Sequence, residues 1–301
     1  MFLKSDAKVQ RNFQTTKYIK LKDVKTSKMI NFWLEIIHQG SYNHNRLYII
    51  YYMLERNKIY QTDVLDGLKN LDDKSIDLII TSPPYNKRGF NGNQKRTDSC
   101  LWNKTIDYNG DVNVDNMPED KYEQWQIEIL NECFRVLKDD GSLFYNHKLR
   151  VHKNKASFPL EWINKSKFIF RQLITWDRSS SVNMDKCRYI PSTEYIFWLI
   201  KEQKNPRFKR LDNTLFPTEV WKFAPARNNN HPAPFPIELP DNIIPNVAQG
   251  DRILVLDPFM GSGTVACSAV KNNCDYIGFE LFQQYIDMAN EKIKKMEEKI
   301  N

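Results

Sequence analysis

The sequence predicts an α/β protein whose core is a doubly wound, mostly parallel sheet, and two observations carry this prediction. Short apolar stretches alternate with longer stretches of helical periodicity along most of the 301 residues, and strands that alternate with helices in this way form parallel sheets. Two of the apolar stretches, residues 78–80 and 253–256, are rich in branched side chains with no polar alternation, which is typical of strands buried on both faces. Because a chain of this length can bury one sizeable core, we expect one main domain.

An N-terminal extension, residues 1–56, precedes this domain. It carries ten Lys or Arg against four Asp or Glu, so it is basic. Residues 1–26 have no clear apolar face and predict an arm. A serine can cap a helix over residues 27–37, and residues 43–56, rich in Tyr and Leu, predict a second helix. The main domain is then expected at residues 57–301.

The main domain begins with a short strand from Lys58, an acidic turn and a short helix that ends at Leu71. The strand at residues 78–80 must stop before Pro83 and Pro84, because proline lacks the N–H that a sheet ladder needs. Helical periodicity over residues 118–138 then predicts a helix that covers the sheet. The remaining elements follow from the same two patterns: strands at residues 142–146, 169–176, 194–200, 252–257 and 274–279, and helices at residues 160–166, 265–271 and 283–300.

Residues 86–117 are polar and rich in Asn, Gly, Lys and Asp. This stretch is long for a connection without secondary structure in a compact domain, and such connections are usually functional or disordered. We therefore expect a mobile loop beside a binding site.

The turn Ser82-Pro83-Pro84-Tyr85 is the first candidate site. Ligands bind at the carboxyl ends of strands in open α/β sheets, and this turn follows such an end. The two prolines hold the backbone rigid, so the Ser82 hydroxyl and the Pro83 carbonyl would be pre-aimed acceptors, and Tyr85 would offer a flat face for stacking. In that role Tyr85→Phe is expected to be nearly silent. The alternative is a Pro-Pro turn that only ends a strand.

The second candidate site is residues 257–264, Asp257-Pro258-Phe259-Met260-Gly261-Ser262-Gly263-Thr264. A strand leads into it and a helix follows. Glycines there let the backbone approach a ligand closely, and the helix start offers unpaired N–H groups. The next strand ends in Glu280, about twenty residues on, where a carboxylate can bind the two hydroxyls of a ribose. This order of elements predicts a site for a nucleoside-containing cofactor.

Together the two motifs resemble those of the S-adenosylmethionine-dependent DNA methyltransferases that modify exocyclic amino groups of bases. Ser82 to Tyr85 match the family's catalytic motif, and Phe259 to Gly263 match its Phe-x-Gly-x-Gly cofactor motif. The catalytic motif comes first and the cofactor motif last, which is the permuted order of the family's beta group. The resemblance implies a Rossmann-like, circularly permuted class I methyltransferase fold, with S-adenosylmethionine as cofactor and double-stranded DNA as partner.

The resemblance also implies roles for single residues. Ser82, Pro83, Pro84 and Tyr85 would be catalytic, and no metal would take part. Cofactor contacts would come from Asp63, His231, Asp257, Phe259, Gly261, Ser262, Gly263, Thr264 and Glu280. Asp63 would lie near the adenine, although it can instead cap the following helix, and His231 would contact the methionine side. Residues 199–230, with seven Lys or Arg against three Asp or Glu, match the place of the target-recognition region.

The target base follows from the form of the first motif. Thr-Ser-Pro-Pro-Tyr resembles the form found in enzymes that act on N4 of cytosine, so we expect a DNA (cytosine-N4-specific) methyltransferase of a restriction-modification system that flips its target base. N6 of adenine is the alternative, because a hydroxyl can accept a hydrogen bond from either amino group. Two further alternatives are an RNA, protein or small-molecule methyltransferase and a catalytically silent DNA-binding subunit. Methylation at carbon 5 of cytosine is not expected, since none of the five cysteines stands in a Pro-Cys pair.

Composition gives the remaining expectations. A formal net charge of +7 and a pI near 9.0 favour a polyanionic partner. The cysteines are odd in number and lack Cys-x-x-Cys spacing, which argues against a disulfide framework and a zinc site. No apolar run approaches the roughly twenty residues that a membrane span needs, and the first residues lack the core of a signal peptide. We expect a cytoplasmic monomer or homodimer, with a cognate restriction endonuclease as a candidate further partner.

Overall fold

The computed structural model describes residues 18–20, 49–51, 54–86, 117–152, 155–179, 189–202, 205–226 and 236–300. The chain forms two compact units, Met1–Leu54 and Glu55–Asn301. In the first unit, strand β1 (Tyr18–Lys20) pairs in parallel with strand β2 (Ile49–Tyr51). The helix predicted over residues 43–56 is therefore wrong at β2, where two β-branched residues and a tyrosine favour a strand. The helix predicted over residues 27–37 lies outside the described residues.

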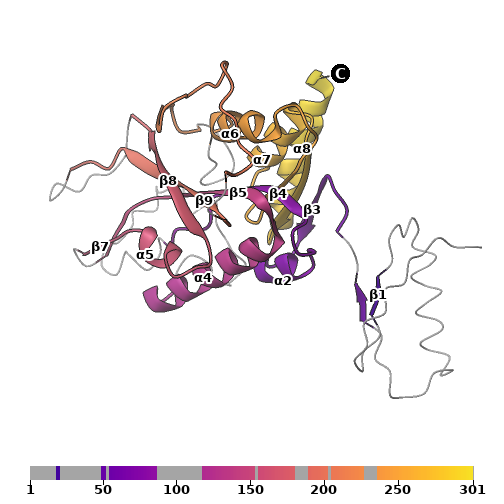
Figure 1. Ribbon diagram of the computed structural model, residues 1–301, viewed down its shortest axis with the longest axis horizontal. Helices are drawn as coiled ribbons and strands as arrows, with labels where there is room; N and C mark the ends of the chain where they lie inside the picture. The colour runs from indigo at the N-terminus through magenta and orange to yellow at the C-terminus, as the bar shows by residue number, and fades with distance from the viewer. Residues whose placement is uncertain are drawn as a thin grey trace, which may run out of the picture. The chain divides into compact units, whose positions relative to one another are not determined.

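The second unit contains a sheet of eight strands in the order β10-β8-β9-β5-β4-β11-β12-β3 (Figure 1). The strands are β3 (Lys58–Gln61), β4 (Ile76–Thr81), β5 (Leu137–His147), β8 (Ile169–Asp177), β9 (Thr193–Ile200), β10 (Val220–Lys222), β11 (Leu254–Asp257) and β12 (Asp275–Glu280). Within this sheet every neighbouring pair is parallel except the two that β9 makes, with β5 and β8. Two short strands, β6 (Arg150–His152) and β7 (Lys155–Ser157), pair antiparallel in a separate sheet. The predicted doubly wound, mostly parallel sheet is confirmed.

Helices cover both faces of the sheet. Helices α2 (Val64–Lys69), α4 (Glu119–Val136) and α5 (Leu160–Ile163) lie on one face, and α6 (Glu238–Ala248), α7 (Thr264–Lys271) and α8 (Gln283–Ile300) lie on the other (Figure 1). The longer helices present an apolar stripe at helical spacing; α4, for example, buries Tyr122, Ile129, Leu130, Cys133 and Val136. Among the described helices, none is long and apolar enough to cross a membrane.

Helix α5 is shorter than predicted. The expectation of a helix to residue 166 is wrong, because the helix ends at Ile163. Beyond it, the N–H groups of Lys165 and Ser166 donate to carbonyls three residues back, and such tighter bonds commonly close a helix.

The order of connections places a ligand site between β4 and β11. From β4 the chain passes through α4 to β5 on one side, and from β11 it passes through α7 to β12 on the other. The strand order therefore reverses where β4 and β11 pair, with Leu78 opposite Val255. Ligands of open α/β sheets bind outside the carboxyl ends of the strands at such a point. The turn after β4 and the turn after β11 hold the two sequence motifs, so the fold brings the motifs side by side.

Candidate functional site

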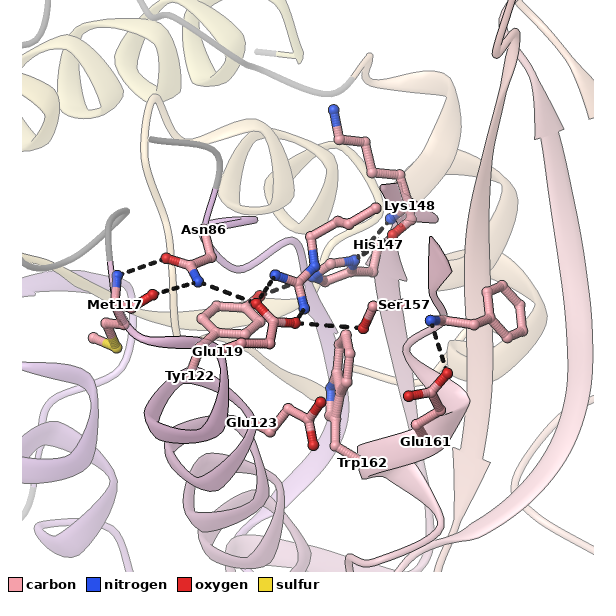
Figure 2. A network of polar contacts seen from close by, with 12 residues as sticks. Asn86, Met117, Glu119, Tyr122, Glu123, His147, Lys148, Ser157, Glu161 and Trp162 are labelled. Carbon is pink, nitrogen blue, oxygen red and sulfur yellow. Dashed lines mark hydrogen bonds and ion pairs between the residues drawn. The ribbon is translucent and has the colours of Figure 1, made fainter. Parts of the chain in front are cut away.

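The turn after β4 is held by a series of hydrogen bonds from helix α4 and strand β5, of which Figure 2 shows the side chains of Tyr122, His147 and Lys148. Tyr122 of α4 donates its hydroxyl proton to the Pro84 carbonyl at 2.7 Å, and its oxygen lies 2.8 Å from His147 Nε2. The backbone N–H of Lys148 donates to His147 Nδ1 at 2.9 Å. Since Tyr122 gives its one proton to Pro84, the imidazole Nε2 of His147 donates to the Tyr122 oxygen. These hydrogen bonds further restrain a turn that two prolines already stiffen.

Asn86 follows this turn and ties it to the start of α4 (Figure 2). Its side-chain amide exchanges two hydrogen bonds with the backbone of Met117, at 2.9 and 2.7 Å. Next to this pair, Glu119 accepts hydrogen bonds from both terminal guanidinium nitrogens of buried Arg150, one at 2.8 Å. The two ends of the predicted loop 86–117 are thus joined, and residues 87–116 between them lie outside the described part of the chain.

Ser82 and Tyr85 belong to a second polar cluster at the same edge. Their hydroxyl oxygens are 2.8 Å apart, and the Tyr85 hydroxyl donates to Glu194 Oε2 at 3.1 Å. Asn146 Nδ2 donates to Tyr85 Oη at 2.9 Å and to Glu194 Oε2 at 3.2 Å, and it lies 3.4 Å from Ser82 Oγ. Tyr85 is 8% exposed, and its ring centroid lies 4.4 Å from that of His147. Burial, with the Glu194 charge adding to it, raises the pKa of Tyr85 well above its ordinary value.

Sequence reasoning missed Asn146 and Glu194. Asn146 ends a buried apolar stretch of β5, and Glu194 is the acidic residue near the start of the apolar strand β9. A polar side chain in such a strand is a usable signal, because burying it requires a partner. The cluster also changes the expectation for Tyr85→Phe, since the hydroxyl that this substitution removes contacts three side chains.

The turns after β4 and β11 share one carboxylate. Asp257 Oδ1 accepts hydrogen bonds from Thr81 Oγ1 at 2.8 Å and from the N–H of Phe259 at 3.0 Å. The Phe259 ring meets Trp125 of α4 edge-on, with centroids 5.8 Å apart. Asp257 is 1% exposed, and burial raises its pKa to about 7. The residue therefore joins the two candidate sites and titrates near neutrality.

The glycine turn has the backbone that the sequence motif predicts. Gly261 and Gly263 adopt φ of 50° and 82°, a region that favours glycine. A Cβ at Gly263 would lie 2.7 Å from the Cβ of Ala289, so packing against α8 also requires glycine there. Glu280, at the end of β12, accepts the N–H of Gly261 at 2.9 Å, and burial raises its pKa. Ser262 Oγ is buried and has no hydrogen-bond partner among the described residues.

Three further residues are predicted to contact the cofactor, Asp63, His231 and Thr264. Asp63 caps α2, since its Oδ1 accepts the N–H of Leu65 at 2.8 Å. It follows β3, whose last residue Gln61 pairs with Glu280, so Asp63 lies at the same edge of the sheet. His231 lies outside the described residues. Thr264 is the first residue of α7.

Part of the predicted recognition region 199–230 packs on helix α6. Asn242 and Asn246 of α6 accept the backbone N–H groups of Phe216 and Leu211, both at 2.8 Å. A pocket of about 220 Å³ lies between this segment and the sheet, and its aromatic lining includes Trp198, Phe208, Phe216 and Trp221. Lys209 and Arg210 are exposed on the same segment.

The titration of Asp257 predicts how stability depends on pH. The folded protein keeps the Asp257 proton up to about pH 7, whereas the unfolded chain loses it near the ordinary aspartate pKa of 3.8. Between these values the folded state binds one more proton, so the free energy of unfolding falls as pH rises, by an amount on the order of 4 kcal/mol, and levels off above pH 7. Denaturant unfolding of wild-type protein and Asp257→Asn from pH 4 to 8 measures this. The free energy of unfolding of wild-type protein minus that of Asp257→Asn should fall as pH rises from 4 to 7, and parallel curves would contradict the assignment.

Comparisons with known proteins agree with this arrangement. The family model for the DNA methylases of the N6/N4 methyltransferase type matches residues 76–291. Type II methyltransferase M.BglII from Bacillus subtilis is 29% identical over 267 residues, covering 77% of this chain and 68% of the relative. The DNA adenine methyltransferase YhdJ from Escherichia coli (strain K12) is 27% identical over 266 residues, covering 78% and 82%.

Solved structures share the fold. The PvuII DNA methyltransferase (cytosine-N4-specific) aligns with a TM-score of 0.61 at 21% identity, covering 83% of this chain and 94% of its own. The M1.HpyAVI–SAM complex aligns with a TM-score of 0.52 at 19% identity, covering 78% and 98%.

Proposed function

The chain belongs to the N6/N4 methyltransferase family of DNA methylases, and on this premise we propose that it transfers a methyl group from S-adenosylmethionine to N4 of a cytosine in duplex DNA. The observation that carries the proposal is the hydrogen-bonded junction of the two turns at the point where the strand order reverses, through Thr81 and Asp257. The sequence Thr-Ser-Pro-Pro-Tyr of the first motif favours cytosine as the target base. N6 of adenine is the alternative, since an adenine methyltransferase stands among the relatives.

The residues present fit S-adenosylmethionine. Glu280 offers a carboxylate to the ribose hydroxyls, the turn Gly261–Gly263 offers backbone N–H groups, and buried Ser262 Oγ is an unused polar atom beside them. We assign the other predicted contacts to Asp257, Phe259, Thr264, Asp63 and His231. When bound, the cofactor supplies an electrophilic methyl group on a sulfonium.

The catalytic residues then orient the nucleophile. A base inside a stacked duplex cannot present its amino group, so it must rotate out at a cost of a few kcal/mol. The Ser82 hydroxyl and the Pro83 carbonyl would accept the two amino hydrogens and turn the nitrogen lone pair toward the methyl group. Tyr85 would stack on the base through its ring. Transfer is then a direct displacement that depends on positioning and electrostatics, with no covalent intermediate.

DNA contacts are assigned to the two basic regions, residues 1–56 and 199–230. In the second, the backbone of 205–226 is anchored on α6, which leaves Lys209 and Arg210 at the surface to reach DNA. We assign target recognition to this region. A chimaera that carries this segment from a relative should methylate a different sequence, and an unchanged sequence would place recognition elsewhere.

Product analysis tests the proposed function. Purified protein is incubated with DNA and S-adenosylmethionine, and the DNA is digested to nucleosides for mass spectrometry. The expected product is N4-methyldeoxycytidine. N6-methyldeoxyadenosine would support the alternative base, and the absence of both would overturn the assignment to amino methylation of DNA.

A further inference from the structure

The cluster of Ser82, Tyr85, Asn146 and Glu194 contains polar groups to which the mechanism above gives no role. Three of its members are buried: Tyr85 and Glu194 are each 8% exposed and Asn146 is 2% exposed. Ser82 is only half-buried. Ser82 is therefore the member whose hydroxyl is most open to a bound base, whereas the polar groups of the other three belong to buried residues.

The number of available protons decides which group donates and which accepts in each hydrogen bond of this cluster. A carboxylate only accepts hydrogen bonds and is a stronger acceptor than a hydroxyl, so Tyr85 donates its one proton to Glu194. The contact of 2.8 Å between Ser82 and Tyr85 then requires that Ser82 donates to Tyr85. With its proton turned inward, Ser82 Oγ presents a lone pair outward. Without the charge at Glu194, the Tyr85 proton could turn to Ser82, and Ser82 would point a donor outward.

An ion pair holds the carboxylate of Glu194 in place. Its second oxygen, Oε1, lies 2.9 Å from Arg178 Nη1. The Arg178 guanidinium also lies over the Trp176 ring, 5.7 Å from the centroid, a contact that favours a cation there. Asn146 supports the same hydrogen-bond directions, because its Nδ2 donates to both Tyr85 and Glu194.

We propose that Glu194 is a positioning residue for methyl transfer: through Tyr85 it sets the direction of the Ser82 proton, so that Ser82 accepts a hydrogen bond from the amino group of the target base. This inference rests on the proposed function. It assigns Glu194 no contact with base or cofactor, and its effect on the reaction passes through the Tyr85 hydroxyl.

Glu194→Gln tests this role, because the amide keeps the size but replaces one carboxylate oxygen by a donor. We expect kcat to fall about 10- to 100-fold, the range for one lost hydrogen bond to a charged group. KM for DNA and the cofactor dissociation constant should stay within twofold of wild type. Glu297→Gln, an exposed position on α8, is the matched control and should have wild-type kinetics.

A double-mutant cycle separates positioning from a general structural role. Tyr85→Phe removes the hydroxyl that connects Glu194 to Ser82, and it should lower kcat by the same factor as Glu194→Gln. The kcat of the double variant should be no lower than that of either single variant. Additive losses, or wild-type kcat in Glu194→Gln, would overturn the inference. If Glu194→Gln does not fold, Tyr85→Phe decides alone, and wild-type kcat there overturns it. Absence of methyl transfer by the wild-type protein would instead overturn the proposed function.

Discussion

Ser82→Ala is expected to lower the single-turnover rate of methyl transfer by about 10²–10³, the usual cost of losing one oriented contact to the reacting group. Ser82 follows a fully buried strand, and its hydroxyl is held 2.8 Å from Tyr85, so the acceptor is fixed before the base arrives. Cofactor affinity and DNA affinity should change little, because the substitution removes one atom and leaves the prolines and Tyr85 in place. The variant should therefore lose rate of methyl transfer and keep its affinity for cofactor and DNA.

Single-turnover kinetics with saturating cofactor measure this effect. Ser75→Ala is a matched control, since Ser75 lies just before β4, at its other end, and its hydroxyl makes a hydrogen bond of 2.7 Å to the Asp72 carbonyl. The control should transfer methyl groups at the wild-type rate. A Ser82→Ala protein that binds cofactor and reacts as fast as wild type would exclude this turn as the catalytic site.

Glu280→Gln is expected to weaken S-adenosylmethionine binding about 10- to 100-fold. A charge-assisted hydrogen bond is about twice as strong as a neutral one, and the amide can accept with only one of its two terminal atoms. In the folded protein both carboxylate oxygens are engaged, by the N–H groups of Gly261 at 2.9 Å and Phe282 at 3.0 Å. The substitution therefore affects the proposed ribose contact and the shape of the glycine turn together.

Isothermal titration calorimetry measures the cofactor affinity, and Glu298→Gln, exposed on α8, is the control with the same chemical change. Circular dichroism checks that the variant keeps its fold. Wild-type affinity in Glu280→Gln would remove this residue from the cofactor site, whatever the catalytic activity of the variant.

The elements of the main domain were largely predictable because they depend on local pattern. The helix predicted at residues 283–300 coincides with α8, and the glycine turn between β11 and α7 follows the motif. The strand β2 was missed because three residues are too few to show a period. Helix α5 ended early because its last turn tightens, which the apolar pattern does not report.

The buried part of the candidate site was not predictable in the same way. Asn146 and Glu194 meet because β5 and β9 pair antiparallel, with Asn146 opposite Ile196. This pairing joins residues far apart in the sequence, and no local pattern specifies it. The Tyr85 hydroxyl was expected to have little effect because the motif describes the aromatic ring, whereas the contacts of the hydroxyl come from β5 and β9.

The reversed direction of β9 has a consequence for how this protein can diverge. Strands β4, β5, β11 and β12 place residues of the candidate site at or just beyond their carboxyl ends, but β9 places Glu194 near its start. Glu194 is fixed by the register of β9 against β5 and β8, so its position depends on strand pairing and not on the number of residues between Arg178 and Glu194. This protein can therefore diverge in that stretch of sequence while Ser82, the proposed catalytic residue, keeps its contact with Tyr85.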